Sequence, residues 1–390
     1  MSKIALCWEL GGGLGHISVL APLAHYYIEQ GHEVICILKS GTTKYREIFP
    51  KNVVLFSTPS TLKSETETLS SYSDILWHIG YQDINWLQNS LNNWRNIFKQ
   101  QKCDIIICDH SPTARLAAHS LNLKHAAIGT GFCCPPAKNP YPKFEIASKK
   151  YSPKDIESIL LKNINQSLDK LQCSPIEQIS KVLSHSNEFL CTLPHLDHYT
   201  RDQPQDYWGP IITKCIGHSF TWPNKHPYKI FCYLKSNVSN LNTFAEAFNL
   251  IEADKVIYIG GTKINNTLFD SSTVILTNPA KIESITSNAN LVISHGGHNL
   301  TAQLLMAGIP NLLIPMFMEQ SILAHKLQQQ GLCSVCFLDD SIEKLVIAIN
   351  KSLEDKQLSD NTRLFSQHYY GYDSDAQLED IAESILEIEQ

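Results

Sequence analysis

The stretch over residues 291–320, LVISHGGHNLTAQLLMAGIPNLLIPMFMEQ, limits the possible folds of this chain more than any other part of it. Residues 291–294 form an apolar run with the length of a buried strand. Two glycines then let the backbone turn sharply, and apolar residues recur at helical spacing over residues 298–307. Residues 311–314 form a second apolar strand. Strand, glycine loop, helix and strand in this order predict a parallel crossover in an α/β sheet.

The glycine loop and the helix that follows it have the features of a phosphate site. The backbone N–H groups and the positive end of the dipole at a helix start favour an anion. His295 can donate a hydrogen bond to a phosphate oxygen. Asn299 and Gln303 are four residues apart, so they share a helix face that could reach toward a sugar. An ordinary crossover turn with a capping Asn is the alternative, and the spacing alone does not separate the two.

The same residues resemble the C-terminal donor motif of the family 1 glycosyltransferases. That motif runs His-x-Gly-x-Asn-Ser/Thr, an acidic residue, Gly-x-Pro and Asp/Glu-Gln, and this chain has HGGHNLT, AGIPNLLIP and Glu319-Gln320. The resemblance implies that His295, Gly297 and Asn299 hold the diphosphate of a nucleotide sugar. It also implies that Glu319 and Gln320 bind the sugar hydroxyls.

Three positions depart from the family pattern. Leu300 stands where the family has a small hydroxyl residue, and Gln303 stands where an acid usually holds the ribose. Gln can still donate and accept a hydrogen bond. Lys235-Ser236 replaces the Gly-Ser that follows the first strand of the second half, so Lys235 is either an extra cation for the diphosphate or a solvated side chain.

The N-terminus begins a second strand, glycine loop and helix, with the loop GGGLGH at residues 11–16. A dinucleotide site is disfavoured, because the third glycine of that fingerprint falls on His16 and the second strand ends without the ribose-binding acid. Gly15-His16 and the GHEV at residues 31–34 instead resemble the N-terminal signature of the same glycosyltransferase family. In that family the His of the first loop is the general base.

An imidazole at this position suits that chemistry. Its pKa lies near neutrality, and a helix start favours the neutral form of His16, which could take a proton from an acceptor hydroxyl. Asp109 follows the apolar strand at residues 104–108 and matches by position the Asp that orients the base in the family. Two alternatives remain open: His16 only caps or packs in its loop, or His110 takes either role.

Residues 70–99 are predicted to be helical, with an apolar stripe at spacings of three and four. Trp77, Tyr81 and Trp86 lie off that stripe. They either line a pocket for an apolar or aromatic acceptor or pack against a neighbouring element. The pair Cys333-x-x-Cys336 has metal or redox spacing, but no second pair lies nearby, so both are predicted to be structural thiols.

Composition excludes several other classes of protein. A net charge of −6 provides no electrostatic footprint for nucleic acid. No apolar run reaches the roughly 18 residues of a membrane span, and the N-terminus lacks the apolar core of a signal peptide. A cytoplasmic protein is therefore expected. The Asp-x-Asp at residues 373–375 lies at a helix start and is predicted to be an N-cap, so no metal site is expected.

The length of 390 residues predicts two or three domains at about 150 residues each. The resemblance implies an α/β fold with two Rossmann-like domains facing across a cleft, the GT-B architecture. Residues 1–210 would bind the acceptor, residues 211–227 would be a linker, and residues 228–370 would bind the nucleotide sugar. Residues 371–390 would form a helix that packs back on the N-terminal domain.

The activity implied is inverting transfer of a hexose from a UDP or dTDP sugar to a hydroxyl of a small-molecule or lipid acceptor. No metal cofactor is expected, and peripheral membrane contact stays open. A nucleotide-sugar epimerase and a non-catalytic glycosyltransferase-like partner protein are the alternatives. The predicted catalytic residues are His16 and Asp109, and the predicted donor-binding residues are Gly15, Ser236, Ala280, His295, Gly296, Gly297, Asn299, Gln303, Glu319 and Gln320.

Overall fold

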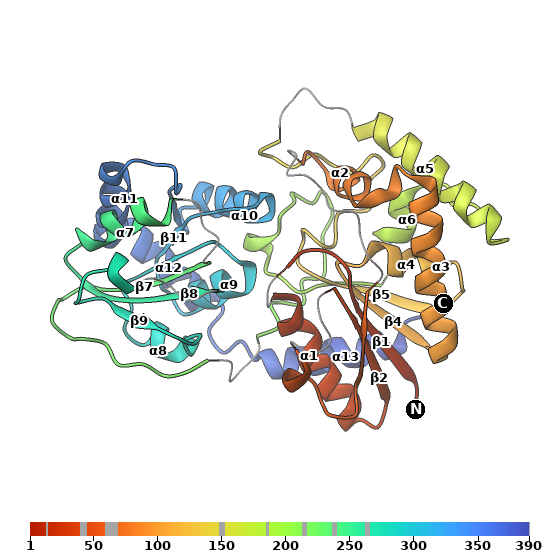
Figure 1. Ribbon diagram of the computed structural model, residues 1–390, viewed down its shortest axis with the longest axis horizontal. Coiled ribbons are helices and arrows are strands. Elements are labelled where there is room, and N and C mark those ends of the chain that lie inside the picture. The colour runs from red at the N-terminus through yellow and green to blue at the C-terminus, as the bar shows by residue number, and fades with distance from the viewer. Residues whose placement is uncertain are drawn as a thin grey trace. The chain divides into compact units, whose positions relative to one another are not determined.

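The computed structural model describes residues 1–12, 15–39, 45–58, 69–147, 153–184, 187–212, 217–235, 240–261 and 266–389. The chain forms two compact units. Unit 1 comprises Met1–Ile211 with Asp373–Gln390, and unit 2 comprises Ile212–Tyr372. Each unit contains one six-stranded parallel sheet with helices packed on it (Figure 1). The predicted fold class, an α/β protein with two Rossmann-like domains, is confirmed.

The sheet of unit 1 has the strand order β3-β2-β1-β4-β5-β6. The chain adds strands on one side of β1 and then crosses to β4 on its other side. Parallel sheets bind ligands where the strand order reverses in this way, at the carboxyl ends of the two central strands. The strands are β1 (Lys3–Trp8), β2 (Glu33–Leu38), β3 (Val54–Ser57), β4 (Ile105–Asp109), β5 (Lys124–Gly129) and β6 (Glu188–Leu190).

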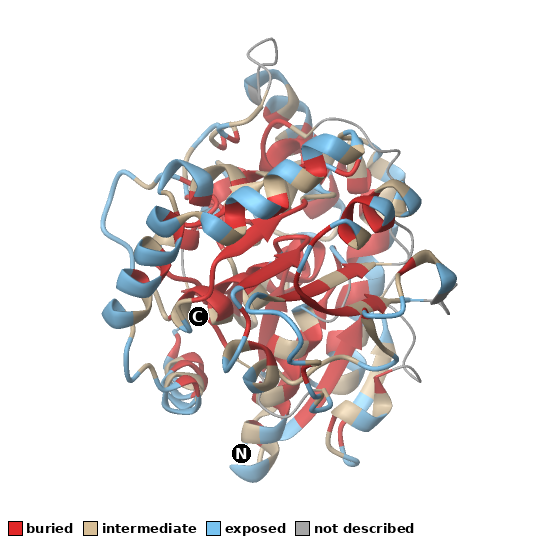
Figure 2. Cartoon of the chain, turned by 90° about the vertical axis from the view of Figure 1, so that its left-hand side faces the viewer, coloured by how far each residue is buried: buried red, intermediate tan, exposed pale blue. Residues whose placement is uncertain are grey.

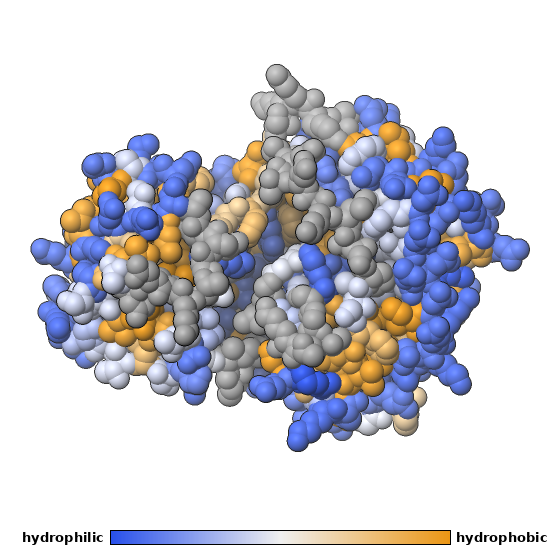
Figure 3. All heavy atoms as spheres, viewed as in Figure 1, coloured by the Kyte–Doolittle hydropathy of each residue, from blue (hydrophilic) through white to orange (hydrophobic). Residues whose placement is uncertain are grey.

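The helices of unit 1 cover a sheet whose central strands are buried. Figure 2 shows the sheets as buried red ribbons beneath helices with exposed outer faces. In Figure 3 the surface over α3 and α5 is mostly hydrophilic. The helices are α1 (Gly15–Glu29), α2 (Tyr72–Leu76), α3 (Ile84–Gln101), α4 (Pro112–His119), α5 (Pro153–Lys170), α6 (Ile179–Leu183) and α13 (Ser374–Glu387), with short turns η1 (Arg46–Ile48), η2 (Trp77–Tyr81) and η3 (Pro194–Leu196).

Helix α13 returns from the far end of the sequence and lies against α1 (Figure 1). The Tyr27 hydroxyl donates to the Ala382 carbonyl oxygen at 3.1 Å. Ile381 and Ile385 are fully buried in the same apolar core as the strands β1 and β2. The last residues of the chain therefore complete the core that its first residues begin.

The predicted helix over residues 70–99 is wrong as a single element. The structure divides it into α2, the turn η2 and α3. The break lies at Gly80, whose φ of 126° is not helical. The indole of Trp86 packs on this glycine, since a Cβ added there would lie 2.3 Å from the ring. The side-chain periodicity did not indicate this close contact.

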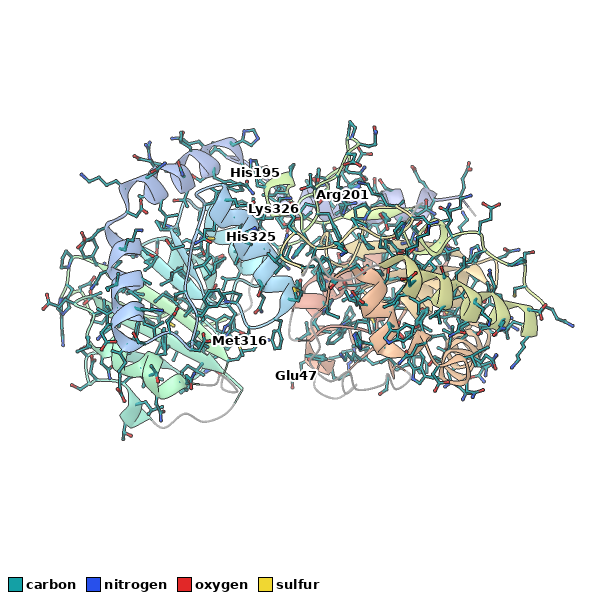
Figure 4. The ribbon with its side chains drawn as sticks, turned by 90° about the horizontal axis from the view of Figure 1, so that it is seen from above. Glu47, His195, Arg201, Met316, His325 and Lys326 are labelled. Carbon is teal, nitrogen blue, oxygen red and sulfur yellow. The ribbon has the colours of Figure 1, made fainter. Side chains whose placement is uncertain are left out.

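A buried ion pair fixes residues 197–207, near the end of the first segment of unit 1. Arg201, labelled in Figure 4, donates from Nε to Asp197 Oδ2 at 2.5 Å. The Tyr207 hydroxyl donates to the same oxygen at 2.9 Å. Because Asp197 is fully buried, these partners offset the cost of removing its charge from water.

Unit 2 repeats the strand arrangement of unit 1. Its sheet has the order β12-β11-β10-β7-β8-β9, so the reversal lies between β7 and β10. The strands are β7 (Lys229–Lys235), β8 (Asp254–Gly260), β9 (Val274–Leu276), β10 (Leu291–Ser294), β11 (Asn311–Leu313) and β12 (Ser334–Val335). The helices are α7 (Leu241–Asn249), α8 (Ile282–Thr286), α9 (His298–Met306), α10 (Met318–Gln329), α11 (Ile342–Glu354) and α12 (Lys356–His368), with the turn η4 (Asn266–Leu268).

Candidate functional site

His16 and Asp109 meet at the strand reversal of unit 1. His16 is the second residue of α1, and Asp109 ends β4, next to β1. Their Nδ1 and Oδ2 atoms are 2.9 Å apart, and the side chains are 14% and 3% exposed. A carboxylate accepts only, so this contact places a proton on Nδ1 and the lone pair on Nε2. The pair thus has the form of an oriented imidazole base.

The glycine loop leaves room for the other side of the imidazole. A Cβ added to Gly11 would lie 2.4 Å from Nε2 of His16, so the loop can pass this atom only because Gly11 has no side chain. The indole of Trp8 stacks on the imidazole with 5.0 Å between centroids. Lys39, the residue after β2, donates from Nζ to the Gly11 carbonyl oxygen at 2.7 Å and fixes the glycine loop. Gly15 begins α1 beside this loop.

His110 is a poorer candidate for the base. The residue is 6% exposed, and burial lowers its pKa to about 3, with smaller contributions from the charges of His16 and Lys39. Its Nε2 has no hydrogen-bond partner among the described residues. It borders a cavity of about 10 Å³, room for one water molecule. A neutral imidazole with such a low pKa is a weak proton acceptor, so the geometry favours His16.

Of the three aromatic residues considered for an acceptor pocket, Tyr81 and Trp86 pack within unit 1. Tyr81 is fully buried, and its hydroxyl donates to Thr113 Oγ1 at 3.2 Å. Trp86 packs on Gly80, and Trp77 is half-buried in the turn between α2 and α3. A different aromatic group lies next to His110 and was not identified from the sequence, because its members come from three separate segments: α2, the loop after β5 and the segment after η3. It comprises Tyr72, Phe132, Tyr141, Phe144 and Tyr199.

In unit 2 the glycine loop joins β10 to α9 as the sequence predicts. Gly296 has φ of +74°, a conformation that glycine adopts readily. Gly297 is the N-cap of α9, with no side-chain cap, and an added Cβ would meet nothing within 4 Å. The Gln303 amide donates back to the Asn299 carbonyl oxygen at 3.1 Å. The start of α9 therefore has open space beside it, while Gln303 turns toward its own helix.

The prediction that His295 donates to a phosphate is wrong for this geometry. Its Nε2 accepts from the Lys235 N–H at 2.8 Å, and its Nδ1 donates to the Ile314 carbonyl oxygen at 3.1 Å. Burial lowers its pKa, with a smaller contribution from the charge of Lys235. Both ring nitrogens are used to tie the end of β7 to the segment that follows β11.

One side-chain atom of Gln320 is also used in hydrogen bonds to the backbone. Its Oε1 accepts from the N–H groups of Met316 and Phe317 at 2.8 and 3.3 Å (Met316 is labelled in Figure 4). Only its amide nitrogen thus remains for the sugar contact that the sequence predicts. Glu319 lies partly exposed in the first turn of α10.

Of the two remaining predicted donor positions, Ala280 lies within the described residues and Ser236 does not. Ala280 is half-buried in the loop after β9, which is fixed by a bond from the His218 N–H to the Pro279 oxygen at 2.8 Å. The Lys281 N–H donates in turn to the His218 oxygen at 3.0 Å. Ser236 lies outside the described residues.

Cys333 and Cys336 are both buried, and burial raises the pKa of each thiol to about 12. Across the part of the chain that the structure describes, no three His, Cys, Asp or Glu side chains gather as metal ligands. In the same described ranges, no helix combines the length and apolar character needed to cross a membrane.

Comparison with known proteins gives one domain match and many structural likenesses. Residues 252–374 match the model of the glycosyltransferase family 28 C-terminal domain. A search of curated protein sequences finds no match. The matching model describes family 28 rather than family 1, so the resemblance holds at the level of GT-B glycosyltransferases.

Among solved structures, the calicheamicin glycosyltransferase CalG4 aligns with a TM-score of 0.72 and 17% identity, covering 99% of this chain and 98% of that chain. The glycosyltransferase VinC in complex with DTDP aligns at 0.66 and 13%, covering 98% and 100%. The glycosyltransferase SnogD from Streptomyces nogalater aligns at 0.62 and 14%, covering 99% of both chains. At these identities the likeness establishes the fold. The chain thus has the fold of GT-B glycosyltransferases, and its residues 252–374 match a glycosyltransferase C-terminal domain model, which confirms the predicted enzyme class, a glycosyltransferase.

Proposed function

We propose that this protein transfers a sugar from a nucleoside diphosphate donor to an acceptor hydroxyl, with inversion at the anomeric carbon. The observation that carries the proposal is the His16–Asp109 pair, 2.9 Å apart at the strand reversal of unit 1. The match of residues 252–374 to a glycosyltransferase C-terminal domain supports a donor site in unit 2.

The proposed donor is a dTDP or UDP sugar. VinC was solved with DTDP, and the glycosyltransferase SsfS6 was solved with thymidine diphosphate. In this chain the start of α9, with Gly297 at its N-cap, is the proposed diphosphate site. Its N–H groups and helix dipole would stabilise the negative charge that grows on the leaving diphosphate, so no metal ion is required.

The proposed mechanism uses a single base. Nε2 of His16 takes the proton of the acceptor hydroxyl as its oxygen attacks the anomeric carbon from the face opposite the diphosphate. Asp109 holds the Nδ1–H tautomer and stabilises the imidazolium that forms. The C–O bond to the diphosphate breaks as the new glycosidic bond forms, which inverts the configuration.

The test compares His16→Ala and Asp109→Asn with His25→Ala, which changes an exposed His on the same helix. We expect His16→Ala to abolish transfer and Asp109→Asn to lower kcat by about 10²–10⁴-fold, because the tautomer is lost. All three should bind UDP or dTDP in calorimetry as the wild type does. Normal turnover by His16→Ala would remove this residue from the mechanism, and product formed from donor alone would indicate an epimerase.

A further inference from the structure

Lys235 stands where the strand order of unit 2 reverses. It is the last residue of β7, and β7 pairs directly with β10, which leads into the glycine loop. Its backbone N–H donates to His295 Nε2 at 2.8 Å. The same imidazole bonds to the Ile314 oxygen, so the backbone of Lys235 is fixed relative to the ends of two other strand segments. The fold therefore fixes the point from which the Lys235 side chain extends.

The ammonium of Lys235 has a specific place. Its Nζ lies 5.5 Å from the ring centroid of Phe317, the N-cap residue of α10. A cation over an aromatic face is attracted by the ring quadrupole. Phe317 is 50% exposed, and within the described ranges no carboxylate forms an ion pair with Lys235. The positive charge is thus held at the carboxyl edge of the sheet, with no counter-charge paired to it among the described residues.

Two positive features therefore come from different elements of the same unit. One is the start of α9, where Gly297 provides no side chain and α9 has no acid in its first turn. The other is the Lys235 ammonium on β7. His295 cannot supply a further donor in this geometry, because both of its nitrogens are occupied. A nucleoside diphosphate carries two phosphates and so offers one to each feature, whereas a mononucleotide carries a single phosphate.

We propose that Lys235 binds the diphosphate of the donor and that Phe317 holds its ammonium ready for that contact. This inference rests on the proposed function of the protein as a nucleotide-sugar transferase. It assigns one phosphate to the start of α9 and the other to Lys235. Charge-assisted hydrogen bonds to phosphate are about twice as strong as neutral ones, so Lys235 sets the preference for diphosphates over monophosphates.

The experiment measures the affinities of UDP, dTDP, UMP and dTMP by calorimetry on the full chain. Lys235→Met is compared with Lys229→Met, the same substitution at the opposite end of β7. We expect Lys235→Met to lose about tenfold or more in diphosphate affinity and less than about twofold in monophosphate affinity. Lys229→Met should match the wild type, and Lys235→Arg should keep most of the diphosphate preference. Phe317→Leu should lose a few fold.

The outcomes separate this inference from the proposed function. If the wild type binds the diphosphates and Lys235→Met keeps the same preference over monophosphates, Lys235 does not bind the diphosphate and the inference is overturned. An equal loss for mono- and diphosphates also overturns it. If the wild type binds no nucleotide, the proposed function itself fails. Circular dichroism checks that each variant is folded, and Lys235→Arg against Lys235→Gln repeats the test should the Met variant unfold.

Discussion

At the scale of single residues, burial rather than residue type decides which side chains can do chemistry. His16 and His110 are neighbours, but only His16 has a carboxylate on its Nδ1, whereas burial lowers the pKa of His110 to about 3. Glu9 stands one residue beyond β1 and is 1% exposed. It accepts from the Thr113 N–H at 2.9 Å in the first turn of α4. Burial raises its pKa to about 7, so Glu9 titrates near neutral pH while its side chain accepts a hydrogen bond from α4.

Glu9 makes stability depend on pH. Its carboxyl titrates near 4.5 when unfolded and near 7 when folded, so the folded state keeps the proton between these values. Its contribution to stability is complete below pH 4.5 and is lost as pH rises through 7. We expect Glu9→Gln to gain about 2 to 3 kcal/mol over the wild type between pH 5 and pH 8, at 1.36 kcal/mol per pKa unit.

Urea unfolding at the two pH values measures this gain. Glu29→Gln, which changes an exposed carboxyl on α1, is the control and should follow the wild type at both. If the free energy of unfolding of Glu9→Gln changes between pH 5 and pH 8 by as much as that of the wild type, Glu9 does not couple folding to pH.

At the scale of elements, local patterns predicted the crossover but not the partners of its side chains. Strand, loop, helix and strand at residues 291–314 correspond to β10, α9 and β11. The bonds of His295 could not be predicted, because its partners are 60 residues before it and 19 residues after it. His16 and Asp109 are 93 residues apart, and only the resemblance to a known family linked them before the structure did.

The two glycines of the loop before α9 give a matched pair of variants. Gly296→Ala would strain a backbone with φ of +74° and place a methyl 3.3 Å from Leu313, so we expect a loss of about 1–2 kcal/mol in unfolding free energy. Gly297→Ala has an allowed φ of −63° and open space, so its stability should change by no more than about 1 kcal/mol.

Nucleotide binding separates the two glycines further. The methyl of Gly297→Ala would stand where the proposed phosphate approaches the start of α9, so we expect UDP or dTDP affinity to fall about tenfold without loss of fold. Calorimetry and thermal unfolding on the same samples measure both effects. Unchanged affinity in a folded Gly297→Ala would place the phosphate away from this helix start.

At the scale of the whole molecule, unit 2 is one uninterrupted stretch of sequence but unit 1 is not. Unit 1 consists of two segments of the chain, Met1–Ile211 and Asp373–Gln390. The returning helix α13 buries Ile381 and Ile385 in the core around β1 and β2. The resemblance to the glycosyltransferase family implied a C-terminal helix over residues 371–390. Its amphipathic pattern did not show which surface it covers, since α1 and α13 are joined only by contacts between distant parts of the chain.

The contribution of α13 can be measured by truncating one buried side chain. We expect Ile385→Ala to lower the free energy of unfolding by about 2–5 kcal/mol, since it removes a fully buried isoleucine. Asp380→Ala, on the exposed side of the same helix, should stay close to the wild type. Calorimetric scans compare the two. If Ile385→Ala unfolds at the same temperature as the wild type, this side chain of α13 does not stabilise the core.

The bonds of His295 have a consequence for mutational screens. A search for inactive variants would identify this position as essential, because replacing it leaves the Lys235 N–H and the Ile314 oxygen without partners in the interior. The defect would then be a shortage of folded protein rather than failed chemistry. Activity normalised to the amount of correctly folded protein would recover much of the apparent loss, whereas a screen scored by colony phenotype would not distinguish this structural defect from a catalytic one.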